Sequence, residues 1–187
     1  MKNKIEFDIF IKGNVVDLVV LTEEVIDKTN WYKWFNVEEN TKHMQKHYYP
    51  NSKELQLKYF KEEIDGNDKK FQLGIVRKDK NLLCGVISLS NIDHLNGCCE
   101  IGLIIGEAEA RKIQYFIEAV KLTCNHAFDT LNINRIYSGT ISKEIDELFC
   151  RILGFEHEGL SRQAVFKNGA YHDVYRHALL KENRKTL

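Results

Sequence analysis

The chain has 187 residues, with 27 lysines and arginines against 27 aspartates and glutamates, so its formal net charge is zero. This balance argues against binding to nucleic acid or to an anionic membrane, because both need a basic excess. No apolar run approaches the ~20 residues of a membrane span, and the opening residues MKNKIEFDIF contain no signal-peptide core. We therefore expect one globular domain, residues 1–187, in the cytoplasm.

The cysteines and histidines give no sign of a metal centre. The five cysteines are an odd number without a CxxC motif, which is typical of a reduced intracellular protein. His43 and His47 stand four residues apart in HMQKH, but the glutamate of an HExxH motif is missing. Two histidines do not complete a zinc site, and we expect no bound metal.

The first half of the chain predicts a strand, a helical region and a three-stranded meander. VDLVVLT (16–22) favours a strand, and EEVIDKTNWYKWFN (23–36) favours helix or turns. NSKELQLKYFKEEID (51–65) predicts a helix in which Asn51 is the N-cap and Glu54 completes a capping box. Three apolar runs separated by two turns then favour antiparallel strands. These runs are residues 70–78, 82–92 and 98–106.

The second half predicts a long helix, a strand, a short helix and a hairpin. Apolar residues recur at helical spacing over about 113–130, and INRIYSGTI (133–141) favours a strand. Ser142 and Gly154 can cap and end a helix over SKEIDELFCRIL. The KNG turn joins two strands of a closing hairpin. The element order favours an α+β fold with one mixed, mostly antiparallel sheet of about seven strands.

Six stretches, taken in order, resemble the GNAT superfamily of acetyl-CoA-dependent N-acetyltransferases, especially its ribosomal-protein, polyamine and amino-sugar subgroups. The resemblance implies acetyl transfer from acetyl-CoA to the primary amine of an amino-sugar nucleotide, a polyamine or a protein N-terminus. It also allows a homodimer through the terminal strands. The six stretches are WYKWFNVEENTKHM (31–44), CGVISLSNID (84–93), EIGLIIGEAEA (100–110), EAVKLTCNHAFDTLNINRIY (118–137), RILGFEHEG (151–159) and VFKNGAYHDVYRHALL (165–180).

The family's cofactor binds along one strand and at the start of the next helix. Its pantetheine arm pairs with a strand edge that corresponds here to Leu103, Ile104 and Ile105. Its pyrophosphate meets backbone N–H groups at a helix start that corresponds to residues 111–116. The cofactor-binding residues implied there are Arg111, Lys112, Ile113, Gln114, Tyr115 and Phe116.

Candidate catalytic residues are Glu100 and Cys150. Glu100 occupies a strand position where the family often has a base, although a solvent-facing carboxylate is the simpler interpretation. Cys150 stands where the family usually has a tyrosine that protonates the departing thiolate, and unpaired cysteines are more often buried apolar residues. The aromatic segment that flanks the acceptor site in the family suggests four substrate contacts, with core packing as the alternative. These are Trp34, Phe35, His47 and Tyr48.

The sequence departs from the family at the cofactor turn. Lys112, Gln114 and Phe116 occupy positions where glycines are usual, and glycine lets phosphate approach the backbone closely. Two hypotheses remain open. The chain is either a divergent acetyltransferase or a GNAT-fold binding or regulatory module with altered acetyl-CoA binding. A Phe116 side chain that packs inward favours the enzyme, and one that lies across the turn favours the module.

Overall fold

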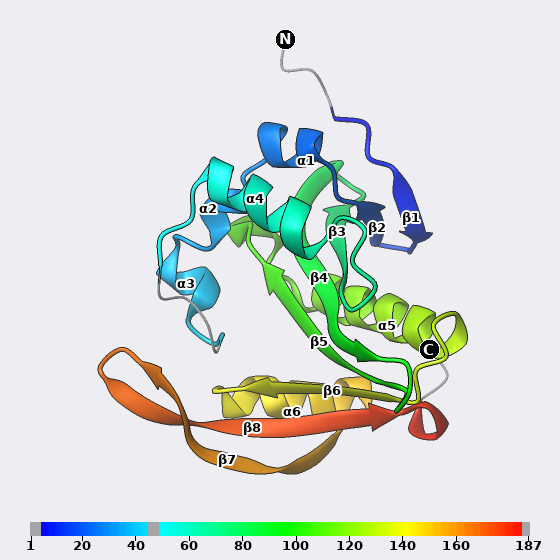
Figure 1. Ribbon diagram of the computed structural model, residues 1–187, viewed down its shortest axis with the longest axis vertical. Coiled ribbons are helices and arrows are strands. Elements are labelled where there is room, and N and C mark those ends of the chain that lie inside the picture. The colour runs from blue at the N-terminus through cyan, green and yellow to red at the C-terminus, as the bar shows by residue number, and fades with distance from the viewer. Residues whose placement is uncertain (1–4, 45–48, 185–187) are drawn as a thin grey trace.

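The computed structural model describes residues 5–44 and 49–184. Its centre is an eight-stranded sheet with the order β1-β2-β3-β4-β5-β6-β8-β7 (Figure 1). All neighbouring strands pair antiparallel except β5 and β6, which are parallel. The strands are β1 Ile9–Lys12, β2 Val16–Val20, β3 Phe71–Arg77, β4 Leu82–Asp93, β5 Cys98–Ile105, β6 Arg135–Thr140, β7 Glu156–Lys167 and β8 Ala170–Leu180. The α+β fold expected from the sequence is confirmed.

The sheet has eight strands rather than the predicted seven or so, because β1 could not be recognised from the sequence. This strand has four residues, IFIK, and lies at the edge of the sheet, where most of its side chains are exposed. An edge strand this short carries no clear alternation of apolar and polar residues. Its pairing with β2 depends on the hairpin geometry, which the composition of the segment does not reveal.

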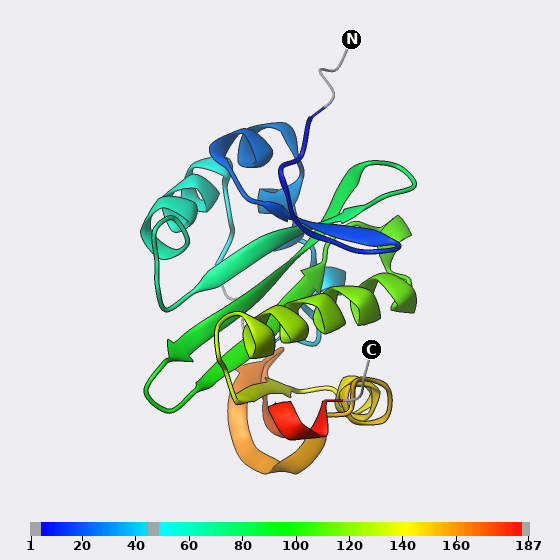
Figure 2. The ribbon, with the colours of Figure 1, turned by 90° about the vertical axis from the view of Figure 1, so that its right-hand side faces the viewer.

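Helices cover both faces of the sheet (Figure 2). α5 and α6 pack on one face in the larger apolar core, and α1, α2 and α4 pack on the other face in a second core. The helices are α1 Glu23–Lys28, α2 Trp31–Trp34, α3 Glu38–Thr41, α4 Lys53–Glu63, α5 Ile113–Asp129 and α6 Lys143–Leu153, with 3₁₀ turns η1 Ala108–Ala110 and η2 Lys181–Asn183. None of the helices in the described ranges is long and apolar enough to cross a membrane.

Local capping signals decide the helix boundaries. Ser142 accepts a hydrogen bond from the Ile145 N–H, and Gly154 ends α6 with φ of 78°, as predicted. The predicted cap of α4 is wrong by one residue. The Ser52 hydroxyl caps this helix by accepting from the Leu55 N–H, whereas the Asn51 side chain is engaged with Gln56.

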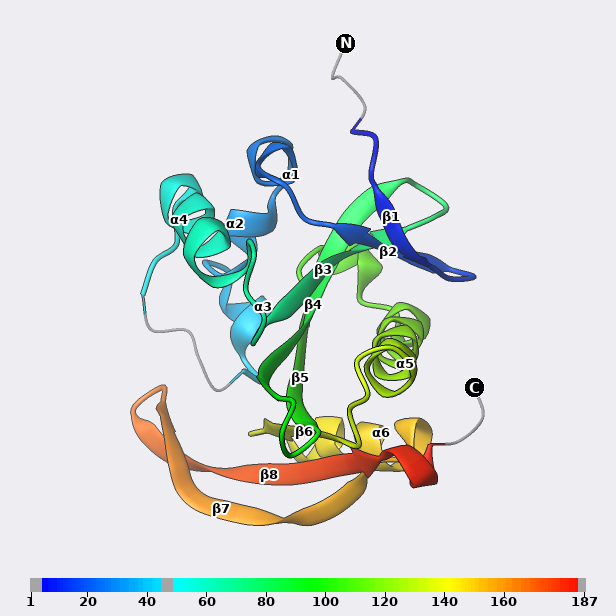
Figure 3. The same ribbon diagram turned by 45° about the vertical axis from the view of Figure 1, so that its right-hand side comes forward.

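The closing hairpin forms as the KNG turn predicts. Asn168 and Gly169 have φ of 50° and 81°, the left-handed values that a tight hairpin turn requires. The hairpin and β6 swing away from the first five strands, so the sheet opens beside β5 (Figure 3).

Candidate active site

The parallel ladder between β5 and β6 is short. It joins Cys98 to Arg135, Cys99 to Ile136 and Glu100 to Tyr137, and no later pair forms between these two strands in the described chain. One side-chain bond continues the contact, from the Ser138 hydroxyl to the Ile101 carbonyl at 2.8 Å. Beyond this point the strands diverge, as Figure 3 shows. The edge of β5 is therefore open from Leu103 onward.

The hydrogen-bond phase of the β4–β5 ladder decides which backbone groups face this gap. The Gly106 N–H donates to the Cys84 carbonyl at 2.8 Å. Opposite residues in an antiparallel pair alternate between bonded and unbonded. Counting back from Gly106, the backbone groups of Ile104 face β4, whereas those of Leu103 and Ile105 face the gap. These two residues supply the free strand edge, and the predicted contact of Ile104 with a cofactor stays a prediction.

The turn between β5 and α5 needs no glycine for its shape. Every residue from Glu107 to Phe116 has a negative φ, so ordinary side chains fit this backbone. One glycine precedes the turn for a different reason. A Cβ placed on Gly106 would lie 2.0 Å from the Trp34 ring, so the indole packs directly on the backbone there. The Trp34 indole N–H also donates to Glu107 at 3.0 Å.

The start of α5 keeps the features of an anion site. Lys112 is the N-cap residue but provides no side-chain cap, and the first turn contains no acidic residue. Uncapped N–H groups and the helix dipole both favour a negative ligand. Arg111 donates to the Asn40 side chain and lies 3.9 Å from Glu39, so α3 holds this cation beside the turn. Ile113 and Gln114 follow on the exposed side of the first turn.

Phe116 packs inward. Its ring meets Phe149 of α6 edge-on at a centroid distance of 5.5 Å, and it is a partly buried member of the larger core. The Tyr115 side chain is buried in the same core. These aromatic side chains therefore form part of the helix's apolar stripe, which is the arrangement that favours the enzyme.

Polar side chains cover part of the sheet face opposite α5. Their cross-strand partnerships place them on one face: Gln72 opposite Ser88, Ser88 opposite Gly102, Ser90 opposite Glu100, and Glu100 opposite Tyr137. We call this set the polar floor: Gln72, Ser88, Ser90, Glu100, Gly102 and Tyr137. A Cβ built on Gly102 would have one neighbour within 4 Å, the Ser88 hydroxyl at 3.7 Å, so the space above this residue is open.

Glu100 lies at the point where the gap between β5 and β6 begins. It belongs to the last residue pair before β5 and β6 separate. Its carboxylate accepts a hydrogen bond from the Asn91 side chain at 3.0 Å. Burial, and next the negative charge of Glu100, raise the pKa of Tyr137. A partly exposed carboxylate at this point can accept a proton from a group bound on the polar floor.

Cys150 has the character of a poorly ionised thiol. It lies half-buried on α6, where burial, and then the charge of Asp146, raise its pKa. A raised pKa lowers the fraction of nucleophilic thiolate. The catalytic role suggested by its position in the sequence stays a prediction.

A carboxylate–histidine cluster centred on the buried Asp146 of α6 was not predicted. Asp146 accepts from His177 Nδ1 at 2.7 Å and from His157 Nδ1 at 3.0 Å. The His177 ring stacks on Phe149 and is buried. The cluster fastens α6 to the last two strands. The three residues come from α6, β7 and β8, and no local sequence pattern brings them together.

The aromatic segment mainly builds the second core. Trp31 is fully buried, Trp34 is only 3% exposed, and Phe35 packs against the same cluster. Core packing, the alternative weighed from the sequence, accounts for these contacts, and direct substrate contact by Trp34 or Phe35 stays a prediction. His47 and Tyr48 lie outside the described residues.

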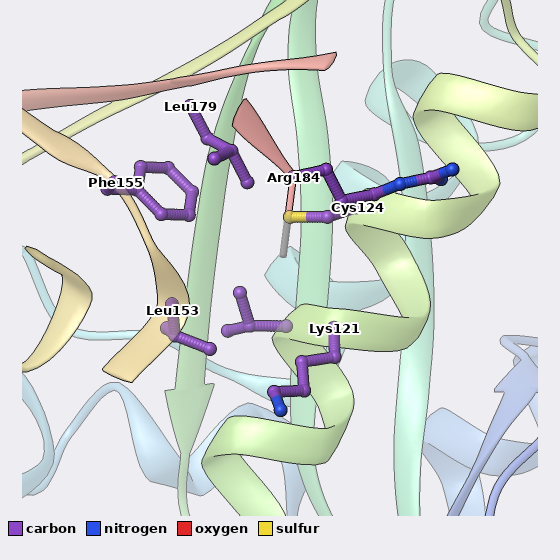
Figure 4. Close-up of a pocket in the computed structure, with 7 residues that line it drawn as sticks. Lys121, Cys124, Leu153, Phe155, Leu179 and Arg184 are labelled. Atoms are coloured by element: carbon purple, nitrogen blue, oxygen red, sulfur yellow. The ribbon is translucent and has the colours of Figure 1, made fainter. Parts of the chain in front are cut away.

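A small hollow lies between α5, the end of α6 and β8 (Figure 4). Val120, Cys124, Leu153, Phe155 and Leu179 line it, with Lys121 and Arg184 around them, and its volume is about 10 Å³. This is roughly the space that one water occupies. The hollow is a packing defect too small to hold a ligand.

The sequence comparisons identify the family. Residues 17–145 match the family model of the acetyltransferase (GNAT) domain, and the chain belongs to this family. A relative named "Putative ribosomal N-acetyltransferase YdaF", from Bacillus subtilis, is 35% identical over 101 residues, covering 53% of this chain and 54% of its own. An uncharacterized N-acetyltransferase, p20 of Bacillus licheniformis, is 30% identical over 119 residues, covering 63% of this chain and 65% of its own. These matches span about half to two thirds of the relatives' length.

Solved structures share the fold. A spermidine N-acetyltransferase from Vibrio cholerae, in complex with CoA and spermine, aligns with a TM-score of 0.81 at 18% identity over 91% of this chain and 98% of its own. The microcin C7 self-immunity acetyltransferase MccE, in complex with acetyl-CoA and AMP, aligns with a TM-score of 0.76 at 20% identity over 90% and 93%. The GNAT-like α+β fold inferred from the sequence is thus confirmed.

Proposed function

We propose that this protein is an N-acetyltransferase that moves an acetyl group from acetyl-CoA to a primary amine. The observation that carries the proposal is the open edge of β5, which lies between the Glu100 carboxylate and the start of α5, a helix start without a side-chain cap. This edge offers backbone groups of Leu103 and Ile105 to an extended ligand. An added strand of this kind binds mainly through main-chain hydrogen bonds.

The residues present fit acetyl-CoA. Leu103 and Ile105 would pair with its pantetheine arm, and the first N–H groups of α5 would hold its pyrophosphate. Lys112 adds positive charge at the same helix start. When bound, acetyl-CoA supplies an activated thioester. Because the helix start lies at one end of the gap and Glu100 at the other, the thioester would lie near Glu100.

Glu100 is the base in this proposal. It receives the proton that the acceptor amine gives up as its nitrogen bonds to the acetyl carbon, and the departing thiolate takes a proton from solvent. Asn91 orients the carboxylate through its 3.0 Å hydrogen bond. The raised pKa of Cys150 makes this thiol a weak proton donor, and we assign it at most a secondary role.

The polar floor favours a cationic acceptor. Glu100 is its one charged member, and the remaining five residues are neutral. A polyamine or a protein N-terminus would be attracted to this surface, whereas the diphosphate of an amino-sugar nucleotide would find no cation among these six residues. The relatives described above, which include a spermidine acetyltransferase and a ribosomal one by name, support the same two classes.

A homodimer belongs to the same proposal. β7 is the outer strand of the sheet, and exposed apolar side chains such as Leu160 lie on it. Pairing of two such edges would join two copies. Light scattering measures the mass in solution, and a monomer at micromolar concentration would contradict this part.

Titration calorimetry with acetyl-CoA tests the function. We expect a micromolar dissociation constant, followed by acetylation of spermidine or of a peptide N-terminus in an acceptor panel that includes a UDP-amino sugar. Turnover of the amino sugar alone would correct the acceptor class. No binding at millimolar acetyl-CoA would favour the alternative, a GNAT-fold module that has lost this ligand.

A further inference from the structure

The turn before α5 keeps a defined shape although no glycine occurs from Glu107 to Phe116. In a turn built from ordinary residues, the orientation of the next helix depends on side-chain restraints. The N–H groups of a helix start bind an anion only if they point at it together. The structure must therefore contain contacts that fix η1 and α5 relative to the sheet.

The side chain of Arg77, at the end of β3, makes these contacts. This side chain is 4% exposed. The guanidinium donates two hydrogen bonds to Asp79, at 2.8 and 2.6 Å. It lies 3.6 Å from the Glu109 carboxylate of η1 and 5.3 Å from the centre of the Tyr115 ring in the first turn of α5. One buried cation thus contacts the β3–β4 turn, η1 and α5.

A second ion pair reinforces the same arrangement. Lys80, in the β3–β4 turn, donates to Glu109 at 2.8 Å. We call the set Arg77, Asp79, Lys80, Glu109 and Tyr115 the turn clamp. Its two carboxylates, Asp79 and Glu109, are both paired with Arg77 or Lys80 inside the clamp.

We propose that Arg77 is a positioning residue that, through the turn clamp, aims the first N–H groups of α5 at the cofactor pyrophosphate. This inference rests on the proposed function. Arginine suits the task because its planar group binds a carboxylate with two bonds and stacks on a ring at the same time. A lysine at this position would keep the charge but lose both features.

Three variants test the role of the clamp. Arg77→Lys and Tyr115→Leu remove the stacking contact, and Tyr115→Phe keeps the ring. We expect CoA to bind at least about tenfold more weakly to Arg77→Lys and Tyr115→Leu, a loss of ~1.4 kcal/mol, and near normally to Tyr115→Phe. Hydrogen exchange of the amides of residues 107–116 should speed up in the first two variants alone.

A donor without pyrophosphate separates positioning from general loss of structure. With the best amine of the acceptor panel, Arg77→Lys should lower kcat/KM about tenfold for acetyl-CoA and leave kcat/KM for S-acetylpantetheine nearly unchanged. Arg184→Lys is the matched control, because Arg184 donates to Asp129 at 2.7 Å and lies 5.7 Å from the centre of the Phe128 ring, at the far end of α5 from the turn. It should leave both donors unaffected.

The outcomes distinguish this inference from the proposed function. Normal CoA binding by both Arg77→Lys and Tyr115→Leu would overturn the clamp and leave the acetyltransferase intact. Equal losses with both donors would show a structural role only and would also overturn it. If the wild-type protein does not bind CoA, the proposed function is wrong, and the proposed role of the clamp in CoA binding is then wrong as well.

Discussion

The two sides of the gap next to β5 contribute to the site with different atoms. On the proposed cofactor side, the backbone of Leu103, Ile105 and the start of α5 would provide most of the binding groups, and the side chains of the turn clamp would hold that backbone in place. On the polar floor, the side chain of Glu100 and the absence of one at Gly102 define the surface. A site made of backbone tolerates unusual residues if the shape is kept, whereas a site made of side chains changes its chemistry with each substitution.

The largest effect expected from this contrast is at Glu100. Glu100→Gln removes the proposed proton acceptor and should lower kcat about 100-fold, within the usual range for general-base catalysis. Steady-state assays over pH 6–9 measure this, and the rise of rate with pH should flatten. Calorimetry should give an unchanged affinity for acetyl-CoA. A variant that retains full activity would show that another group takes the proton.

Filling the open space of the polar floor should affect the acceptor alone. Gly102→Val adds a side chain where one neighbour, the Ser88 hydroxyl, lies within 4 Å of the new Cβ, and valine suits a strand. We expect the KM of the acceptor to rise about tenfold through lost contact. The acetyl-CoA affinity and the melting temperature should stay the same. An unchanged acceptor KM would place the amine elsewhere.

Phe116 offers the converse test on the cofactor side. Phe116→Ala should reduce the free energy of unfolding by about 1–3 kcal/mol, because a partly buried ring is lost from the contact with Phe149. The affinity for acetyl-CoA should change less than about threefold if the backbone alone binds the pyrophosphate. Urea denaturation and calorimetry measure the two quantities. A large gain in affinity would reveal that Phe116 occupies cofactor space.

The smallest effect concerns pH and the cluster around Asp146. Burial lowers the pKa of His177, and its bond to Asp146 opposes the shift. The folded state therefore binds fewer protons at this residue than the unfolded state, whose histidine pKa is about 6.5. Stability should fall as pH drops below that value. Urea denaturation at pH 7.5 and 5.5 measures the loss.

A matched pair of variants assigns the pH effect. His177→Asn keeps a donor near Asp146 and removes the titration, so stability should depend less on pH. His126 is less deeply buried and its pKa is also lowered by burial, so His126→Phe should reduce the dependence by a smaller amount. If the free energy of unfolding changed equally with pH in the wild type and in His177→Asn, titration of His177 would not cause the pH dependence in this range.

Local signals allowed much of the fold to be predicted from sequence. The ends of α6 follow from Ser142 and Gly154, and the hairpin turn follows from Asn168 and Gly169, because caps and turns depend on one or two neighbouring residues. β1 could not be recognised, since its pairing depends on a partner strand rather than on its own pattern.

The site divides in the same way. Glu100 was proposed from its strand position and stays a prediction, whereas the floor around it requires knowing which part of the sheet face the helices leave uncovered. The missing glycines suggested a disrupted turn because glycine is usually needed where φ is positive. The sequence does not show that every φ in this turn is negative. The contact from Arg77 to Tyr115 spans 38 positions of the chain, and no local pattern announces it.

The short β5–β6 ladder also has a mechanical consequence. Three residue pairs connect the first five strands to the last three across the sheet. No two neighbouring strands in the described part of the chain are joined by fewer pairs, and this connection is reinforced on one face by the contact between Phe116 and Phe149. An extended molecule in the gap would bridge the two parts of the sheet in place of the absent pairs. Its binding should make them unfold as a single cooperative unit, with a sharper thermal transition than the free protein.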